Sequence, residues 1–266
     1  MKRHPSPAPG AAPLLEAAGI TKRFGRYTAL DAVDLSIHPG RTVSIVGESG
    51  SGKSTLARIL VGLERADAGT VRFRGRPVRG RRARQAFRRS VGMVFQDPYE
   101  SIDPRLTIGE VVAEPLRAHG LYRDGGAGRV RELLTAVGME GVDADAYPHR
   151  FSGGQRQRVC IARALATDPE LVICDEPTSA LDVSVQAQIL NLLLDLQRRN
   201  GLAYLFITHD LDVVRRISDE VDVLMRGKVV ERGSAVEVTR EPRHAYTRGL
   251  LAAVPASSPR ERRIGT

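Results

Sequence analysis

The run GESGSGKST at positions 47–55 constrains the fold of this chain more than any other stretch. It matches the phosphate-loop pattern, in which a glycine-rich turn leads into a helix that begins with Lys and Ser or Thr. The preceding residues, Thr42–Val46, are mostly apolar or β-branched, as in a strand buried in a parallel sheet. The following residues, Leu56–Val61, carry apolar side chains at helical spacing. The sequence therefore predicts a strand, a phosphate-binding loop and a helix in succession.

The chemistry of this loop depends on its backbone and on two side chains. Because Gly50 and Gly52 lack a Cβ atom, the backbone can point several N–H groups at one anion, and the helix that follows adds the positive end of its dipole. We expect Lys53 to reach the β- and γ-phosphates of a nucleotide and the Ser54 hydroxyl to bind Mg²⁺. An ordinary Gly/Ser-rich surface turn is the weaker alternative. The nucleotide-binding residues expected here are Gly47, Ser49, Gly50, Ser51, Gly52, Lys53, Ser54 and Thr55.

Length and composition set broad limits on the class of protein. The chain has 266 residues, 42% of them hydrophobic, which suffices for one large α/β domain or two small ones. No apolar run approaches the ~20 residues of a membrane span. Residues 1–13 lack the apolar core of a secretory signal, and we expect a disordered tail there. Cys160 and Cys174 form no CxxC pair, so we expect buried thiols in a reducing cytoplasm.

The chain is basic, with a formal net charge of +9 and a pI near 10.1. Excess arginine suggests contact with an acidic partner, either nucleic acid or an anionic membrane surface. The densest cluster spans Arg72–Arg89. A solvated face in an arginine-rich protein is the interpretation that we favour for this cluster.

Strand-like and helix-like patterns alternate along the chain and predict an α/β core that holds an inserted helical segment. Strands are expected at Leu14–Ile20, Leu30–Ile37, Gly69–Gly75, Val91–Phe95, Leu171–Cys174 and Ala203–Thr208, with a hairpin over Val221–Glu231. Helices are expected from Ile108, at Arg129–Val137, Gly154–Ala166, Val185–Arg199 and Leu211–Ile217, with a flexible loop at Arg123–Gly128. From about Glu241 the pattern indicates a basic tail with an amphipathic turn, Tyr246–Val254.

Asp175 and Glu176 end the apolar strand Leu171–Cys174. Adjacent carboxylates at the end of a buried strand cost roughly several kcal/mol each when they are unpaired, and a divalent cation removes that cost. We expect Asp175 to hold Mg²⁺ through water and Glu176 to act as the general base on an attacking water. The weaker alternative is a pair of acids that caps a helix before Pro177. The position favours a ligand, because ligands bind at the carboxyl ends of strands in such sheets.

Two further polar residues also follow predicted strands. His209 comes directly after Ala203–Thr208, and from that edge it would contact the γ-phosphate. Gln96 follows Val91–Phe95, where it would sense the γ-phosphate through water or Mg²⁺. Taken alone, each would be interpreted as a structural or loop residue. Their shared place at strand ends makes them candidate catalytic residues beside Glu176.

The run FSGGQ at 151–155 predicts a second helix start able to bind an anion. Ser152 is a plausible N-cap, and free N–H groups there would attract a phosphate. Nothing in the same half of the chain supplies that phosphate. The economical explanation is a partner subunit whose ATP this segment completes.

Taken together, these motifs resemble those of the ATP-binding cassette (ABC) ATPases. The phosphate loop, Gln96, the FSGGQ signature, the strand LVICDE at 171–176, the run SALD at 179–182 and His209 follow the order of that family over about residues 14–234. Phe151 replaces the usual Leu of the signature. The resemblance implies an α/β fold, a P-loop NTPase (RecA-like) core with an antiparallel β subdomain and an inserted α-helical subdomain at about 97–167.

The resemblance also implies roles for residues that the pattern alone does not assign. Phe24 falls where the family places the aromatic ring that stacks on adenine, and Asp182 falls in its D-loop. The implied cofactors are ATP and Mg²⁺, with Ser54, Gln96 and Asp175 at the metal. In the family, two cassettes pair head to tail. The signature residues Ser152, Gly153, Gly154 and Gln155 then complete the site of the partner cassette.

The segments at 96–105 and 182–189 look like those of oligopeptide and dipeptide importer ATPases, a group that includes nickel, opine and glutathione importers. The run HAYTRGLL at 244–251 resembles the C-terminal extension of that group, so we expect an ABC domain over 14–235 and an extension over 236–266. Some members hold an iron–sulfur centre in this extension. No cysteine follows Cys174, so we predict no such cluster here.

The implied assembly is an importer at the cytoplasmic face of the cell membrane. Its expected partners are two transmembrane permease subunits, a second ABC ATPase subunit that we expect to differ from this chain, and, through the permease, an extracytoplasmic solute-binding protein. Peptide is the first expectation for the cargo, followed by nickel or another small solute. The alternatives are a soluble ABC ATPase that acts on nucleic acid, supported only by Arg72–Arg89, and an exporter ATPase or a regulatory ATP-binding module.

Overall fold

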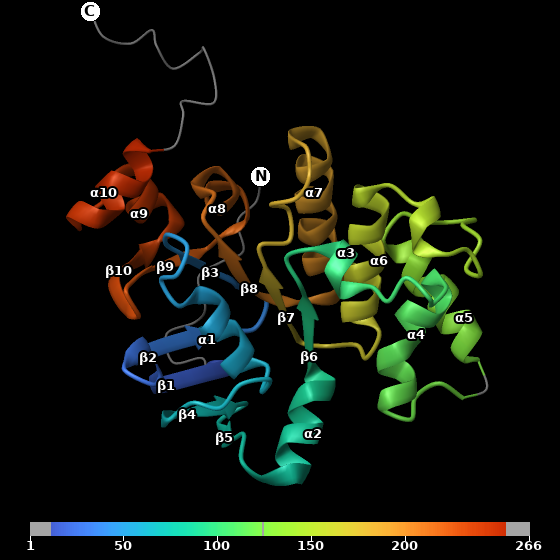
Figure 1. Cartoon of the computed structure of the whole chain (residues 1–266), viewed down its shortest axis with the longest axis horizontal. Coiled ribbons are helices and arrows are strands. Elements are labelled where there is room, and N and C mark those ends of the chain that lie inside the picture. Colours follow the sequence, from blue (N-terminus) through green and yellow to red (C-terminus); the bar gives the residue numbers. More distant parts are fainter. Residues whose placement is uncertain (1–11, 124, 254–266) are drawn as a thin grey trace, which may run out of the picture.

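The computed structural model describes residues 12–123 and 125–253 of the chain. Figure 1 shows two sheets and the helices that cover them. The elements are β1 (Leu15–Phe24), β2 (Tyr27–Ile37), β3 (Thr42–Val46), α1 (Lys53–Leu60), β4 (Ala68–Phe73), β5 (Arg76–Pro77), α2 (Gly80–Ser90), β6 (Val91–Val94), α3 (Pro98–Ser101), α4 (Ile108–Ala118), α5 (Gly126–Ala136), a 3-10 helix (Pro148–Arg150), α6 (Gly153–Leu165), β7 (Leu171–Asp175), α7 (Val183–Asn200), β8 (Ala203–Thr208), α8 (Leu211–Ile217), β9 (Glu220–Met225), β10 (Lys228–Ser234), α9 (Ala235–Arg240) and α10 (Ala245–Ala252).

The larger sheet has six strands in the order β10-β9-β3-β8-β7-β6. Neighbours from β9 to β6 pair in parallel, and β10 returns antiparallel along β9. Every residue of β3, β7 and β8 is buried, which explains why these strands are continuous apolar runs in the sequence. Because the strands are parallel, Val46, Asp175 and Thr208 end them at the same edge of the sheet. The loops that follow converge there.

The smaller sheet is antiparallel, in the order β2-β1-β4-β5. Its first two strands have 10 and 11 residues, so the prediction of short strands at Leu14–Ile20 and Leu30–Ile37 was wrong in their lengths. They pair as far as Phe24 and Tyr27 at the hairpin turn. The polar stretch Thr21–Phe24 lacks an apolar pattern, but pairing with β2 supplies the backbone hydrogen bonds that keep it extended.

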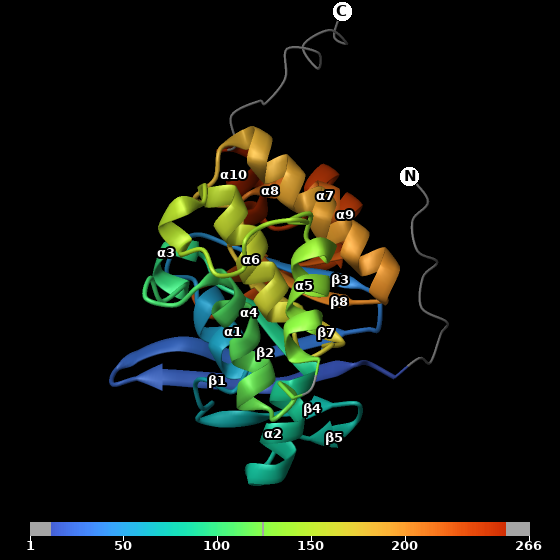
Figure 2. The same ribbon diagram turned by 90° about the vertical axis from the view of Figure 1, so that its right-hand side faces the viewer.

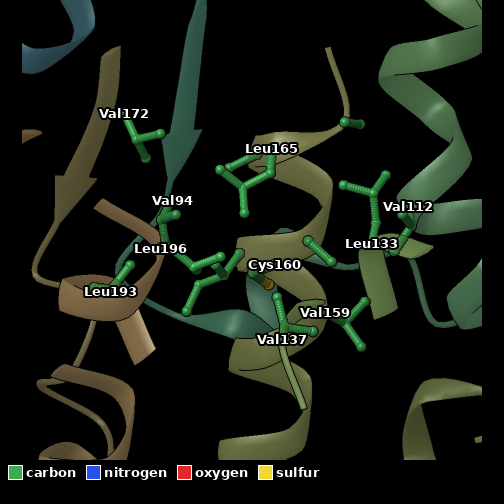
Figure 3. Packing of buried hydrophobic residues seen from close by; sticks show 14 of the residues in the cluster. Val94, Val112, Leu133, Val137, Val159, Cys160, Leu165, Val172, Leu193 and Leu196 are labelled. Atoms are coloured by element: carbon green, nitrogen blue, oxygen red, sulfur yellow. The ribbon is translucent and has the colours of Figure 1, made fainter. Parts of the chain in front are cut away.

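Two hydrophobic clusters cover the two faces of the central sheet. Val43 and Leu205 join α1 and the smaller sheet on one face. Val94, Val172 and Phe206 join α4, α5, α6 and α7 on the other, and Figure 3 shows part of that packing. Neighbouring residues of β8 point to opposite clusters, as the period of a strand requires. The sheet therefore separates α1 from α6.

The helical segment lies to one side of the sheet, with α4, α5 and α6 packed together in one cluster (Figures 1 and 2). Capping boxes at Thr107 and Ser152 start α4 and α6, as local sequence favours. The predicted loop over Arg123–Gly128 was wrong in its end, because α5 already begins at Gly126. Gly125 takes a left-handed φ of 97° at this helix start, and residue 124 lies outside the described residues.

The arginine cluster Arg72–Arg89 contains α2, a helix that the sequence pattern did not predict. Phe87 is its only buried residue, and its ring meets Phe73 edge to face at 5.2 Å between centroids. The arginines of the cluster are exposed. In Figures 1 and 2, α2 extends away from the central sheet beyond β4 and β5.

The C-terminal part of the described chain is ordered rather than a tail with one turn. Val46, Val221 and Val238 belong to a third cluster, against which Tyr246 and Leu250 of α10 pack. This packing places α10 beside the end of β3. The described part of the predicted extension, residues 236–253, thus contains α10, the segment before it and all of α9 but its first residue, Ala235. Residues 254–266, and residues 1–11 of the tail predicted over 1–13, lie outside the described residues. Within the described ranges, no helix has both the length and the apolar character to cross a membrane.

Candidate functional site

Glycines shape the loop between β3 and α1 for different structural reasons. A Cβ atom at Gly47 would lie 2.2 Å from the carbonyl oxygen of Leu224, and one at Gly52 would lie 2.5 Å from that of Ala29. Packing therefore excludes a side chain at either position. Gly50 has open space around it but a left-handed φ of 77°. Gly52 is the N-cap of α1 and offers no side-chain cap, which leaves the first N–H groups of the helix for an anion.

The loop is held from outside by neighbouring elements. The Gly227 N–H, in the turn between β9 and β10, donates to the Ser51 carbonyl at 2.9 Å. The Tyr27 hydroxyl donates to the Gly50 carbonyl at 3.0 Å. The Ser51 hydroxyl is buried and has no hydrogen-bond partner among residues 12–123 and 125–253. A buried polar atom of this kind, beside free helix N–H groups, fits a loop that receives a phosphate.

Lys53 begins α1, and its ammonium group lies inside the loop. Its Nζ atom donates to the carbonyl oxygens of Gly47 and Glu48, each at 2.8 Å. Burial lowers the pKa of Lys53, while the nearby carboxylates of Glu176, Asp175 and Glu48 act in the opposite direction. The ammonium group is thus fixed by backbone carbonyls and faces acidic side chains.

Asp175 and Ser54 meet across the space between β7 and α1. The Ser54 hydroxyl donates to Asp175 Oδ1 at 3.2 Å. Burial raises the pKa of the Asp175 carboxyl, because its charge loses water, and the Ser54 hydrogen bond opposes this effect. A carboxylate and a hydroxyl are hard oxygen donors, which Mg²⁺ prefers. The donor set therefore fits a magnesium ion, which would also stabilise the charged form of Asp175.

Glu176 and His209 lie opposite each other at the ends of the adjacent strands β7 and β8. His209 Nδ1 is 3.1 Å from Glu176 Oε2, and the side chains are 62% and 15% exposed respectively. Glu176 has a φ of 47°, which residues other than glycine rarely adopt. Its N–H donates to the Ile207 carbonyl at 2.9 Å, and its carbonyl accepts from Ser179, so neighbouring backbone holds the strained conformation.

A cavity of about 1190 Å³ opens over the loop and the strand ends. The predicted site residues that line it are Phe24, Gly47, Ser49, Gly50, Gly52, Lys53, Ser54, Thr55, Gln96, Glu176 and His209. Asp175 is not in the lining but lies behind Ser54, to which it is hydrogen-bonded. The structure therefore brings together residues that are up to 185 positions apart in the chain, from Phe24 to His209.

The signature segment Ser152–Gln155 does not line this cavity. It starts α6, which packs on the opposite face of the sheet from α1. Ser152 and Gln155 are exposed and form a reciprocal capping box, with bonds of 3.3 and 2.9 Å. Asp182 does not line the cavity either. It caps α7 through the Val185 N–H at 2.9 Å, and the hydrogen bond from Ser184 is the largest cause that lowers its pKa.

The cavity also contains residues that the sequence analysis did not select. Tyr27 lies near Phe24 at the end of the β1–β2 hairpin. Leu250 and Ala253 come from α10 and its end, and the Glu48 N–H donates to the hydroxyl of Tyr246 in the same helix at 2.9 Å. Tyr27 could have been selected from the sequence, because it is an aromatic residue close to Phe24. The α10 contacts could not, because they depend on tertiary packing.

Comparisons with known proteins identify the family of the chain. The family described as ABC transporter matches residues 30–179. The glutathione import ATP-binding protein GsiA of Salmonella paratyphi A is 49% identical over 265 residues, covering 94% of this chain and 42% of that protein. GsiA of Escherichia coli K12 is 51% identical over 251 residues, covering 92% and 40%. The chain thus spans about two fifths of the length of these relatives.

Solved structures give the same result for the fold. CbiO1 from Clostridium perfringens, part of the ABC transporter complex cbiONQ, superposes with a TM-score of 0.78 at 31% identity, covering 86% of this chain and 92% of that one. The ATP-binding cassette MJ0796, in a dimeric post-hydrolysis state with ADP and Pi, superposes with a TM-score of 0.74 at 33% identity, covering 83% and 98%. The chain therefore belongs to the ABC transporter family, and its fold is that of the family's P-loop ATPase domain.

Proposed function

We propose that this chain is the ATP-binding and ATP-hydrolysing subunit of an ABC importer. The observation that carries the proposal is the convergence of Lys53, the Ser54–Asp175 pair and the Glu176–His209 pair at one sheet edge. A phosphate cradle, a set of hard oxygen donors for Mg²⁺ and a carboxylate that can accept a proton from water are together suited to phosphoryl transfer to water.

The loop and the β1–β2 hairpin would bind the nucleotide. The N–H groups at the start of α1 and the Lys53 ammonium group would hold the β- and γ-phosphates. The half-exposed Phe24 ring would stack on the adenine, with Tyr27 as a second aromatic wall of the cavity. Ser54, Asp175 and Gln96 would hold Mg²⁺, which screens the phosphate charge when it is bound.

Glu176 would accept a proton from the attacking water. Its carboxylate is mostly buried at the end of β7, which limits its motion, and His209 lies within hydrogen-bond reach of it. His209 would orient Glu176 and contact the γ-phosphate. Gln96 lies at the cavity wall, where the chain leaves the central sheet for α3 and the helical segment. It would report the state of the γ-phosphate to that segment.

The signature segment would act in a second cassette rather than in its own. Ser152–Gln155 and Asp182 lie outside the cavity that holds Lys53 and Glu176. The start of α6 is nevertheless exposed and has glycines at its first positions, where a phosphate could approach. We propose that a partner ATPase brings its nucleotide to this segment and receives the present chain's nucleotide on its own signature segment.

Relatives named as glutathione import proteins support the importer direction and a peptide-like cargo. The proposed assembly has two permease subunits, a second ATPase subunit and an extracytoplasmic binding protein that delivers the solute, with this chain peripheral at the cytoplasmic face of the membrane. The relatives and solved structures described above give no support to the nucleic-acid alternative, which rested only on Arg72–Arg89.

The test is a pull-down of tagged Glu176→Gln chain with ATP from detergent-solubilised membranes. The proposal expects two multispanning proteins and a second cassette, and a parallel pull-down with Lys53→Ala should lose the ATP-dependent part of the recovery. Cargo is then identified by screening peptides, glutathione and nickel against the accompanying binding protein. Recovery of nucleic acid or ribosomal proteins without any membrane protein would overturn the transport assignment.

A further inference from the structure

We propose that Tyr246, in the C-terminal helix α10, is a positioning residue for the nucleotide-binding loop. It would hold the peptide unit between Gly47 and Glu48 in the orientation that fixes Lys53. This inference rests on the proposed function, because it concerns binding at the same site. It assigns a role to the run HAYTRGLL at 244–251, which the proposed chemistry does not otherwise use.

The two sides of one peptide unit carry the argument. The N–H of Glu48 donates to the Tyr246 hydroxyl at 2.9 Å. The carbonyl of Gly47, on the other side of the same peptide bond, accepts from Lys53 Nζ at 2.8 Å. Because a peptide unit is planar and rigid, turning it would break both hydrogen bonds at once. The Tyr246 hydroxyl and the Lys53 ammonium group therefore set one orientation together.

The tyrosine itself is held firmly, so it can act as a fixed point. The Glu231 carboxylate, on β10, accepts hydrogen bonds from the N–H groups of Arg243 at 2.8 Å and His244 at 3.0 Å. His244 Nδ1 then caps α10 by accepting from the Tyr246 N–H at 3.2 Å. The Tyr246 ring packs in the cluster that contains Val46, the last residue of β3 before the loop. The helix is thus docked at the base of the loop.

The position of α10 links this contact to nucleotide binding rather than to stability alone. Leu250 and Ala253 line the same cavity as Lys53. Removing the hydroxyl would leave the Glu48 N–H to solvent and let the peptide turn, which withdraws one of the two backbone acceptors of Lys53. Since a net hydrogen bond changes an equilibrium by about three- to tenfold, we expect that loss in nucleotide affinity.

The experiment compares Tyr246→Phe with Tyr204→Phe in the full chain. The control also removes a hydroxyl that donates to a backbone carbonyl, that of Leu193 at 2.9 Å, but in the core away from the loop. Binding of Mg·ATP is measured with trinitrophenyl-ATP by displacement, together with KM, kcat and the melting temperature. For Tyr246→Phe we expect KM and the Kd of ATP to rise about three- to tenfold with kcat within twofold, because the lost contact is present in ground and transition states alike.

The outcomes separate this inference from the proposed function. If the wild-type chain binds and hydrolyses ATP, and Tyr246→Phe matches it in KM and Kd, the positioning role is wrong while the proposed function stands. If Tyr204→Phe raises KM as much as Tyr246→Phe does, the effect is general destabilisation and the inference again fails. If the wild-type chain binds no trinitrophenyl-ATP, the proposed function fails first.

Discussion

Helices α1 and α6 each begin beside glycines, and they differ in what satisfies their first N–H groups. α1 starts at Gly52 without a side-chain cap and opens into the cavity. α6 starts at Ser152, and its capping box with Gln155 satisfies an N–H group from within the chain. The start of α1 therefore leaves its first N–H groups to a ligand, whereas the start of α6 already has the Gln155 N–H satisfied by its own N-cap.

The difference between the starts of α1 and α6 indicates the order in which the two sides of the proposed shared site would bind the nucleotide. The uncapped start has Lys53 inside its loop, and the Ser54–Asp175 pair beside it would hold the Mg²⁺ of Mg·ATP, so it would attract a nucleotide on its own. The capped start has its Gln155 N–H already satisfied by Ser152 and offers a weaker attraction. We infer that the α1 side binds first, and that the α6 side adds its contacts only when a second cassette presents a phosphate.

The largest expected effect concerns hydrolysis, which we propose takes place beside α1. Glu176→Gln should lower ATP turnover by roughly 10²–10⁴-fold, the range for a general base, while ATP affinity stays within about twofold. Asp195→Asn is the matched control, because it makes the same change on α7, at a carboxylate paired with Arg198. Phosphate release and ATP binding are measured for both variants. Wild-type turnover in Glu176→Gln would remove this residue from the base role.

The next largest effect concerns ATP affinity, which we expect to depend on the start of α1. Lys53→Ala should weaken ATP binding by about 10–150-fold, since hydrogen bonds to charged groups contribute about 1.5–3 kcal/mol. Lys228→Ala, which removes an exposed lysine paired with Asp31, should leave binding unchanged. Titration with trinitrophenyl-ATP measures both. If Lys53→Ala and Lys228→Ala lost the same amount of ATP affinity, the helix start at α1 would not be the stronger nucleotide-binding side, and the contrast with α6 would be wrong.

A substitution at the other helix start should affect pairing but not binding. Ser152→Arg places a long, charged side chain at the start of α6, where the partner's phosphate would approach. Most of the ATP-dependent recovery of the second cassette should therefore be lost. ATP affinity of the isolated chain should change by less than about twofold, because Ser152 lies outside the cavity. Co-purification and equilibrium binding test the two statements. Normal recovery of the second cassette would contradict the proposed role of the signature.

The smallest effect sharpens the statement that the start of α6 is capped from within the chain. Ser152→Ala removes an N-cap and should cost about 1 kcal/mol, a fall of roughly 2–4 °C in the melting temperature. Ser234→Ala should cost about the same, because Ser234 forms an equivalent capping box with Glu237 at the start of α9. Thermal unfolding followed by circular dichroism compares the two. A much larger loss at Ser152 would show that its segment has a further structural partner.

The sequence predicted those parts of the fold and the site that depend on local pattern. The strand, loop and helix around Lys53 follow from a continuous apolar run, glycines and helical spacing. The N-cap at Ser152 follows from the four residues that form its box. The meeting of Glu176 and His209 follows from one rule, that parallel strands end at the same edge of a sheet.

The remaining features depend on contacts that a local pattern does not contain. α2 buries only Phe87, so it lacks the apolar periodicity by which a helix is recognised. The polar end of β1 is extended because β2 pairs with it, not because of its own residues. The hydrogen bond between Glu48 and Tyr246 joins residues 198 positions apart. Local sequence patterns cannot predict a contact between residues so far apart in the chain.

The hairpin of β9 and β10 constrains the conformation of the nucleotide-binding loop. The Leu224 carbonyl stands where a side chain at Gly47 would be, and the Gly227 N–H holds the Ser51 carbonyl. A one-residue insertion after Arg226 would shift the Gly227 contact without touching any residue of the loop. In a random insertion library, this surface turn should therefore score as part of the nucleotide site, although it lies some 170 positions away from it in the chain.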